Sequence, residues 1–223
     1  MKIDTANKNK PHQTYRLADG TIVPGVTTVT GGQLGWSKEI LCNWNNKMGL
    51  AGVDTKKFVD EKADIGTLAH LMITNELSGV KTDTDEYSKY VIGKAKNAYK
   101  SWGAWAKHKS IEPIFVEKQM VSEEYKFGGT LDILAGINGD LELIDLKTGS
   151  GIYDEFYIQV GGGYWTLLYE PGGRPMRARI LNIPRADDEL FIEKIVPNIE
   201  ICQRIFLNCL ANYQDHKLLK KEG

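Results

Sequence analysis

Residues 127–149 read FGGTLDILAGINGDLELIDLKTG, and this stretch decides the fold. Two runs of strand-forming residues flank Asn138-Gly139, a dipeptide typical of a tight β-hairpin turn. A third run, IFVEKQMVS at residues 114–122, comes shortly before them. The three runs predict an antiparallel meander.

The same stretch carries acidic and basic residues at strand spacing. Asp145 and Lys147 are two positions apart, so on a strand their side chains share one face while Leu146 points to the other, apolar face. If the strands pair around the turn, Asp132 comes near Asp145. Two neighbouring carboxylates repel each other unless a lysine or cation neutralises them, so a hard divalent metal is a natural occupant. The Leu146 backbone carbonyl is a further candidate oxygen ligand.

Glycines surround these residues. Gly128, Gly129 and Gly149 lack a β-carbon, and we expect them to let a bulky backbone such as DNA come close. Taken alone, however, an Asp-x-Lys triplet more often belongs to an exposed hairpin with a surface ion pair. The interpretation as a site therefore depends on the rest of the chain.

The first half of the chain is predicted to be mainly helical. The segment TYRLADGTIVPGV at residues 14–26 predicts a hairpin around a turn at Asp19-Gly20. Ser37 is expected to cap a helix over 37–48, and Asp54 one over 54–77. Asp83, with Glu86 three residues later, resembles a capping box that opens a helix to about residue 108.

After the meander, the pattern predicts a helix over 154–169, a strand over 176–183 and a helix over 187–216. A helix between two strands allows a right-handed crossover, so we expect a mixed central β-sheet flanked by helices. The fold class is α/β. One domain, 1–223, is expected to comprise a hairpin and helical part (1–110), a sheet core with a crossover helix (111–185) and a C-terminal helix (186–223).

Composition is that of an ordinary globular protein, with 42% hydrophobic and 26% charged residues. The net charge of -1 means that nucleic acid would have to bind a local basic surface. Three cysteines without a CxxC pair indicate a reduced compartment, and Cys202 and Cys209 are expected to face the core. Neither an apolar leader at the start nor an apolar run of membrane-spanning length is present, so we expect a cytoplasmic protein with no membrane partner.

Two further segments are candidates for function. His70 lies in ADIGTLAHLMITNEL, where Gly66 and Ala63 on the same helix face would allow close approach of a sheet; a lone helical histidine is more often a surface or core residue. Between residues 94 and 109, lysines alternate with aromatic residues, which suits DNA binding but is more often a core stripe under a solvated face. These residues are Lys94, Lys96, Tyr99, Lys100, Trp102, Trp105, Lys107 and Lys109. Trp36 and Trp44 are expected to be packing residues.

The ordered set of motifs resembles the RecB-like branch of the PD-(D/E)xK nuclease superfamily, across about two-thirds of the chain (residues 23–169). The matching pieces are VPGVTTVT, GTLAH ending at His70, a strand with Glu117, GGTLD ending at Asp132, IDLKTG with Asp145 and Lys147, and YIQVGGGYW with Gln159 and Tyr164. The resemblance implies a restriction-endonuclease-like core. It gains meaning from the predicted strand context rather than from any single motif.

The resemblance also implies the roles of these residues. His70, Asp132, Asp145 and the Leu146 carbonyl would bind one or two Mg²⁺ or Mn²⁺ ions, and Glu117 would complete that environment directly or through water, although a solvated strand glutamate is an equal alternative. Lys147 would position the attacking water. Gln159, Tyr164, Thr148 and Gly129 would support the site or contact DNA. The family separates its Gln and Tyr by three residues and this chain by four, so Gly163 occupies the usual place of the tyrosine.

The function implied is a metal-dependent DNA exonuclease of recombination, repair or replication, as in compact phage enzymes, acting in a bacterial or phage-infected cell. It would leave a 5′-phosphate and a 3′-hydroxyl. Expected partners are single- or double-stranded DNA ends and a recombinase, single-strand-binding protein or helicase. Some relatives hold an iron–sulfur cluster on four cysteines, which three cannot provide, so no cluster is expected. The alternatives are an endonuclease on the same core and a non-catalytic DNA-binding module.

Overall fold

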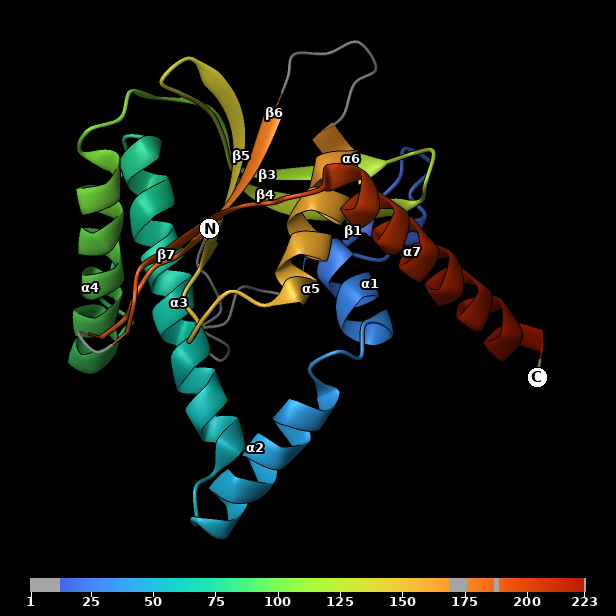
Figure 1. The fold of residues 1–223 in the computed structure, drawn as a ribbon, viewed down its shortest axis with the longest axis horizontal. Helices are drawn as coiled ribbons and strands as arrows, with labels where there is room; N and C mark the ends of the chain where they lie inside the picture. Colours follow the sequence, from blue (N-terminus) through green and yellow to red (C-terminus); the bar gives the residue numbers. More distant parts are fainter. Residues whose placement is uncertain (1–12, 169–175, 187–188, 223) are drawn as a thin grey trace.

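The computed structural model describes residues 13–168, 176–186 and 189–222 (Figure 1). The strands are β1 Tyr15–Arg16, β2 Ile22–Val23, β3 Ile111–Ser122, β4 Phe127–Ile137, β5 Asp140–Lys147, β6 Met176–Asn182 and β7 Ile192–Ile195. The helices are α1 Val26–Gln33, α2 Lys38–Leu50, α3 Thr55–Leu77, α4 Lys89–Ala106, α5 Asp154–Tyr157, the π-helix η1 Ile158–Tyr164, α6 Trp165–Leu168 and α7 Ile199–Glu222. The predicted class is confirmed: an N-terminal hairpin, a helical first half, and a mixed sheet with flanking helices.

The central sheet has the order β3-β4-β5-β6-β7. Strands β3, β4 and β5 form the predicted antiparallel meander, with Ile137 opposite Asp140 across the turn. Strand β6 then runs parallel to β5, because α5, η1 and α6 carry the chain back to the start of the sheet. Strand β7 returns antiparallel to β6 and closes the described sheet.

Helices cover both faces of the sheet (Figure 1). On one face, α3 and α4 pack against residues such as Ile144 and Leu146 of β5. On the other face, α1, η1 and α7 pack against Leu143 of the same strand, because successive side chains of a strand point to opposite faces. Both faces of β5 are therefore buried, and its few polar side chains are held inside the protein.

Of the three predicted helix caps, Asp54 is confirmed, Ser37 makes no capping bond and Asp83 is wrong. Asp54 caps α3, since its carboxylate accepts a hydrogen bond from the Lys57 backbone N–H at 3.0 Å. Ser37 precedes α2 but makes no capping bond, because its hydroxyl bonds Glu155 instead. The predicted capping box at Asp83 is wrong: α4 begins six residues later, with Ser88 accepting from the Val91 N–H at 3.2 Å.

The predicted helix over 187–216 is also partly wrong. Residues 187–188 lie outside the described residues, and β7 occupies part of the remaining segment before α7 begins at Ile199. The sequence IEKI of β7 is short and mostly exposed, so its apolar pattern fits a helix as well as an edge strand. The α7 helix contributes buried Cys202 and Cys209, as predicted.

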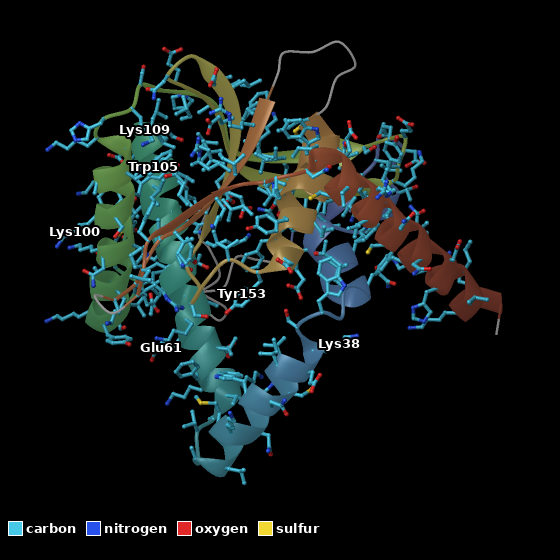
Figure 2. The ribbon with its side chains drawn as sticks, viewed as in Figure 1. Lys38, Glu61, Lys100, Trp105, Lys109 and Tyr153 are labelled. Atoms are coloured by element: carbon cyan, nitrogen blue, oxygen red, sulfur yellow. The ribbon has the colours of Figure 1, made fainter. Side chains whose placement is uncertain are left out.

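The tryptophans divide between core and surface. Trp102 and Trp105 of α4 are buried against α3, whereas lysines such as Lys100 on the same helix are exposed (Figure 2). This confirms the core-stripe interpretation. Trp44 packs on Phe58 with ring centroids 6.0 Å apart. Trp36 is 51% exposed, so its predicted packing role is wrong. No helix in the described residues is both long and apolar enough to cross a membrane.

Candidate metal centre and its polar surroundings

Three side chains with metal-ligating atoms meet at one point. His70 of α3, Glu117 of β3 and Asp132 of β4 each bring one ligand atom, and these atoms lie within 4.8 Å of one another. The His70 Nδ1 atom lies 3.5 Å from Asp132 Oδ2. Asp132 is buried, while His70 and Glu117 are half-buried. The cluster is therefore partly open to solvent, as a ligand site requires.

At Asp132, the side chains of β4 switch from one face of the sheet to the other. Leu131 belongs to the core on the α7 side, whereas Ile133, two positions later, belongs to the core under α3 and α4. Regular alternation would put these two residues on the same face. Pairing with β5 begins only at Ile133, and the Asp132 Oδ2 atom instead accepts a hydrogen bond from the Leu146 N–H at 2.9 Å. The carboxylate thus caps the β5 backbone and is held rigidly.

Glu117 lies across from Asp132 on the neighbouring strand. Val116 pairs with Ile133 and Lys118 with Leu131, so the register places Glu117 opposite Asp132. Its φ of +48° is a left-handed conformation that a residue with a long side chain rarely adopts. Such backbone strain persists where the surrounding structure holds it, and it is concentrated at functional sites. Sequence alone left Glu117 open between a solvated side chain and a site residue, and the structure brings it to the site.

Close packing against β5 holds His70 in position. A β-carbon at Gly66, one turn before His70, would lie 2.6 Å from Thr148 Oγ1. Only a glycine lets α3 approach the end of β5 this closely. The predicted close approach at Gly66 is confirmed, and Thr148 supports α3 through this contact.

Asp145 and Lys147 share one face of β5, as their spacing predicts. Lys147 Nζ lies 2.6 Å from Asp145 Oδ2 and donates a hydrogen bond to Gln159 Oε1 at 3.2 Å. It also lies 4.9 Å from the centre of the Phe156 ring. Asp145 is 2% exposed, and Lys147 is half-buried. The lysine is held at the carboxyl end of β5 by three neighbours while keeping access to solvent.

The π-helix accommodates the additional residue between Gln159 and Tyr164. A π-helix bonds residue i to residue i+5, so residues five apart come to the same side. Gln159 Nε2 accordingly donates to the Tyr164 hydroxyl at 2.9 Å. Gly163, at the usual place of the tyrosine, faces Val26 instead, where a β-carbon would lie 2.4 Å from Cγ1. Lys147, Gln159 and Tyr164 therefore form one chain of polar contacts.

Burial keeps the phenol of Tyr164 neutral. Its desolvation, followed by the nearby Asp145 and Asp132 carboxylates, raises the pKa of Tyr164 well above its usual value of about 10. The hydroxyl consequently stays protonated throughout the physiological range, and its oxygen accepts the hydrogen bond from Gln159.

Two of the glycines next to Asp132 do not leave room for DNA, contrary to expectation. A β-carbon at Gly128 would lie 2.6 Å from the Tyr15 ring, and one at Gly129 would lie 2.9 Å from the Tyr164 ring. The protein's own aromatic side chains fill both positions. Gly129 supports the site through its contact with Tyr164 rather than by opening it.

Sequence reasoning missed Asn182, which fixes the loop after β5. Its side-chain Nδ2 donates to the Gly149 carbonyl at 3.1 Å, and its Oδ1 accepts from the Gly149 N–H at 3.0 Å. Asn182 pairs with Lys147 across the parallel strands and is 1% exposed. A buried amide at the end of an apolar strand was the available signal, since such a group must find partners.

The donor set of His70, Glu117 and Asp132 suits a divalent cation. One imidazole nitrogen and two carboxylate groups are ligands that Mn²⁺ and Zn²⁺ accept, and carboxylates are the usual protein ligands of Mg²⁺. Asp145 lies beside Lys147 and is not part of this three-residue group. The Leu146 N–H faces Asp132, and the Leu146 carbonyl remains a predicted ligand.

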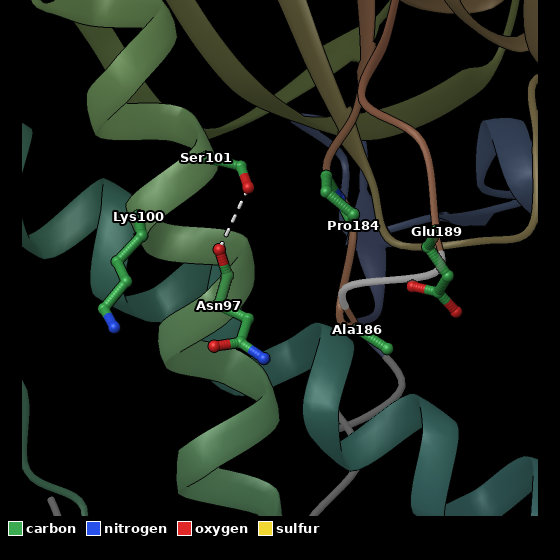
Figure 3. A pocket seen from close by; sticks show the side chains of 6 residues that line it. All are labelled: Asn97, Lys100, Ser101, Pro184, Ala186 and Glu189. Carbon is green, nitrogen blue, oxygen red and sulfur yellow. Dashed lines mark hydrogen bonds between the residues drawn. The ribbon is translucent and has the colours of Figure 1, made fainter.

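A separate pocket of about 300 Å³ lies between α4 and the segment after β6 (Figure 3). Asn97, Lys100 and Ser101 line one side, and Pro184, Ala186 and Glu189 line the other. Glu189 bonds the Arg185 guanidinium at 2.7 Å. None of the predicted site residues lines this pocket.

Comparisons with known proteins give limited information. No protein-family model matches the chain, and no curated protein matches it. Among solved structures, the chain is similar to an alkaline exonuclease from Laribacter hongkongensis, with a TM-score of 0.33 and 15% identity, over 71% of this chain and 86% of that chain. A similarity at this level carries no argument about activity.

Proposed function

We propose that this protein is a metal-dependent deoxyribonuclease that hydrolyses phosphodiester bonds from DNA ends. The observation that carries the proposal is the convergence of His70, Glu117 and Asp132, from three different elements, within 4.8 Å. Asp132 also bonds the backbone of β5 between Asp145 and Lys147, so the ligating group and the lysine are tied together. A carboxylate-rich centre with an adjacent lysine suits phosphoryl chemistry, where negative charge develops.

His70, Glu117 and Asp132 would hold the cation, with Asp145 as a further carboxylate beside them. A bound Mg²⁺ or Mn²⁺ would supply neutralisation of phosphate charge and activation of water for attack. The protein's own residues fix the geometry. The Leu146 N–H orients Asp132, and close packing between Gly66 and Thr148 sets the distance of α3.

Lys147 is placed to meet the substrate. Its ammonium, 2.6 Å from Asp145 and 3.2 Å from Gln159, can donate a hydrogen bond to the attacking water or to a phosphate oxygen. Water attacks phosphorus, the bond from phosphorus to the 3′ oxygen breaks, and that oxygen takes up a proton. The products are a 5′-phosphate and a 3′-hydroxyl. Gln159 and Tyr164 act as positioning residues, since they hold the lysine and do not contact the reacting atoms.

The test uses end-labelled linear DNA, single- and double-stranded, and a covalently closed circle of the same sequence. Each is incubated with Mg²⁺, Mn²⁺ or EDTA. We expect shortening of linear DNA with metal, no cleavage with EDTA, and loss of cleavage in Lys147→Ala. Lys100→Ala, which removes an exposed lysine on α4, is the matched control and should cleave normally.

Four results would contradict the proposal in different ways. Cleavage in EDTA would exclude the metal, and unimpaired Lys147→Ala would exclude the assigned role of the lysine. Cleavage of the closed circle would show an endonuclease on the same site. Binding without cleavage in either metal would show a DNA-binding module.

A further inference from the structure

Two large aromatic side chains, on segments that contact α5, are exposed. Tyr153, in the loop between β5 and α5, is 45% exposed, and Trp36, just before α2, is 51% exposed. In the view of Figure 2, Tyr153 lies between α3 and α5. Single exposed aromatic side chains are common on protein surfaces, so the contacts that hold these two rings carry the argument.

Tyr153 is connected to the lysine through one intervening ring. Lys147 Nζ lies 4.9 Å from the Phe156 ring centre, and the Phe156 and Tyr153 rings meet edge to face at 5.5 Å and 77°. The Tyr153 hydroxyl and Ser150 Oγ are 2.6 Å apart. The ring is thus held at both ends while nearly half of its surface remains in solvent. A fixed aromatic ring loses little entropy when a ligand stacks on it.

Trp36 is connected to the same helix. The Ser37 hydroxyl donates a hydrogen bond to Glu155 Oε1 at 2.5 Å, which joins the start of α2 to α5. Glu155 lies between Tyr153 and Phe156 in sequence. Trp36 directly precedes Ser37, the residue that contacts this segment. We name Trp36, Tyr153 and Phe156 the aromatic ledge. Within it, Phe156 lies against Lys147, and Tyr153 and Trp36 are exposed.

The loop beside the ledge leaves room for another chain. A β-carbon at Gly151 would meet nothing within 4 Å. Asn182 holds the loop at Gly149, so the space above Gly151 belongs to a fixed backbone. An exposed aromatic ring beside an open glycine is suited to a nucleic-acid strand with its bases turned toward the protein.

We propose that the aromatic ledge stacks unpaired bases of a DNA strand and so selects single-stranded DNA, or a frayed end, as the substrate of the Lys147 site. This rests on the proposed function. In a paired duplex the base faces are already stacked on each other and cannot reach Tyr153 and Trp36 without unstacking. Bases of a single strand offer their faces freely, and each stacking contact is sequence-tolerant.

The local charges favour stacking over phosphate attraction. Lys38 is followed by Glu39 at the start of α2, and Asp154 and Glu155 follow Tyr153. With one lysine against three carboxylates, this set offers few phosphate contacts and releases few counterions on binding, so the ledge should contribute little to the salt dependence of affinity. The aromatic rings, and not the lysines, are expected to determine the affinity of this segment.

The test measures binding without cleavage, in EDTA, by fluorescence anisotropy of a labelled oligothymidylate of about 12 nucleotides, the site size of small single-strand-binding domains. A blunt DNA hairpin is the duplex probe. The variants are Trp36→Ala, Tyr153→Ala and the aromatic-preserving Tyr153→Phe. Tyr90→Ala removes a tyrosine of similar exposure (49%) on α4 and is the matched control. Thermal unfolding of each variant shows that it is folded.

We expect Trp36→Ala and Tyr153→Ala each to weaken binding of the oligothymidylate about 10-fold, with an unchanged salt slope. Tyr153→Phe, Tyr90→Ala and hairpin binding should be nearly unaffected. Wild-type-like binding by both alanine variants, equal losses for both probes, or no oligothymidylate binding by the wild type would overturn the inference. Cleavage is assayed in parallel with Mg²⁺ and Mn²⁺. Cleavage that persists when the inference fails leaves the proposed function standing, and absent cleavage alone overturns that function.

Discussion

Strand β5 buries two carboxylates three residues apart, and their surroundings differ. Glu142, 1% exposed, is held by the Arg179 guanidinium through two bonds of 2.5 and 2.7 Å. Arg179 also bonds Glu193 and lies 5.8 Å from the Trp105 ring centre. Asp145, 2% exposed and on the opposite face, meets the flexible ammonium of Lys147 near the imidazole and carboxylates of the candidate metal centre.

The chemistry of the neighbouring groups shows which buried acid is structural. A guanidinium offers five N–H donors and no lone pair, so it can satisfy a carboxylate but cannot bind a metal. An imidazole and a carboxylate both carry lone pairs that bind cations. Burial opposes the charge of Arg179, yet Glu142 and then Glu193 outweigh it and raise the pKa of Arg179. The Glu142 pair is thus complete within the protein, whereas the Asp132 group is built from ligand atoms.

The largest effect should separate these two regions by activity. Asp132→Asn keeps an oxygen for the Leu146 N–H, so the fold should remain while DNA cleavage falls by at least about 1,000-fold. Glu142→Gln, assayed at a temperature where it is folded, should keep nearly normal cleavage per folded molecule. Rates on end-labelled DNA, with circular dichroism of both variants, measure this. Equal losses of activity would remove the distinction.

Stability should respond in the opposite sense. Glu142→Gln leaves Arg179 with the more exposed Glu193 as its only charged partner among those described, so the free energy of unfolding should fall by no more than the roughly 3–5 kcal/mol that breaking a buried pair costs, about 2–3 kcal/mol. Replacing both residues, Glu142→Leu with Arg179→Met, removes both charges and should recover much of that loss. Urea unfolding of the single and double variants tests the coupling. A double variant no more stable than the single one would mean that the pair contributes specific packing.

A metal ion should raise the free energy of unfolding only by binding at the site that has ligand atoms. At Mn²⁺ concentrations of about 100 times the dissociation constant, a cation that binds only the folded protein adds about 2.7 kcal/mol to the free energy of unfolding. We expect Mn²⁺ to raise the unfolding temperature of the wild type and of Tyr90→Ala, but not of His70→Ala. Calorimetric titration with Mn²⁺ gives the affinity directly. Undiminished stabilisation of His70→Ala would place the ion elsewhere.

Residue periodicity in the sequence predicted two of these features correctly. Strand spacing placed Asp145 and Lys147 on one face, and the Asn138-Gly139 turn set the meander. Short-range patterns failed at Asp83, because its carboxylate bonds the Asp85 N–H in a local turn and leaves the cap to Ser88. They failed again at β7, whose pairing with β6 is decided by the sheet and not by its own four residues.

Contacts between distant residues were beyond the reach of pattern reasoning. Nothing near Gly128 or Gly129 in sequence shows that Tyr15 and Tyr164 fill the space beside them. Similarly, the five-residue step from Gln159 to Tyr164 looks like a mismatch on an α-helix and becomes a contact only because the segment is a π-helix.

The smallest effect concerns the residues that hold Lys147. Tyr164→Phe removes the hydroxyl that Gln159 bonds, which should cost about 1 kcal/mol of stability and lower activity only modestly, since Lys147 keeps its pair with Asp145.

The variant also isolates a pH effect. Because burial raises the pKa of Tyr164 in the folded state, its contribution to stability is present below about pH 10 and is lost as the pH rises through the higher folded pKa. Between about pH 9 and pH 11, urea unfolding should therefore show a steeper loss of stability in the wild type than in Tyr164→Phe. Parallel losses in the two proteins would mean that the phenol ionises as readily when folded as when unfolded.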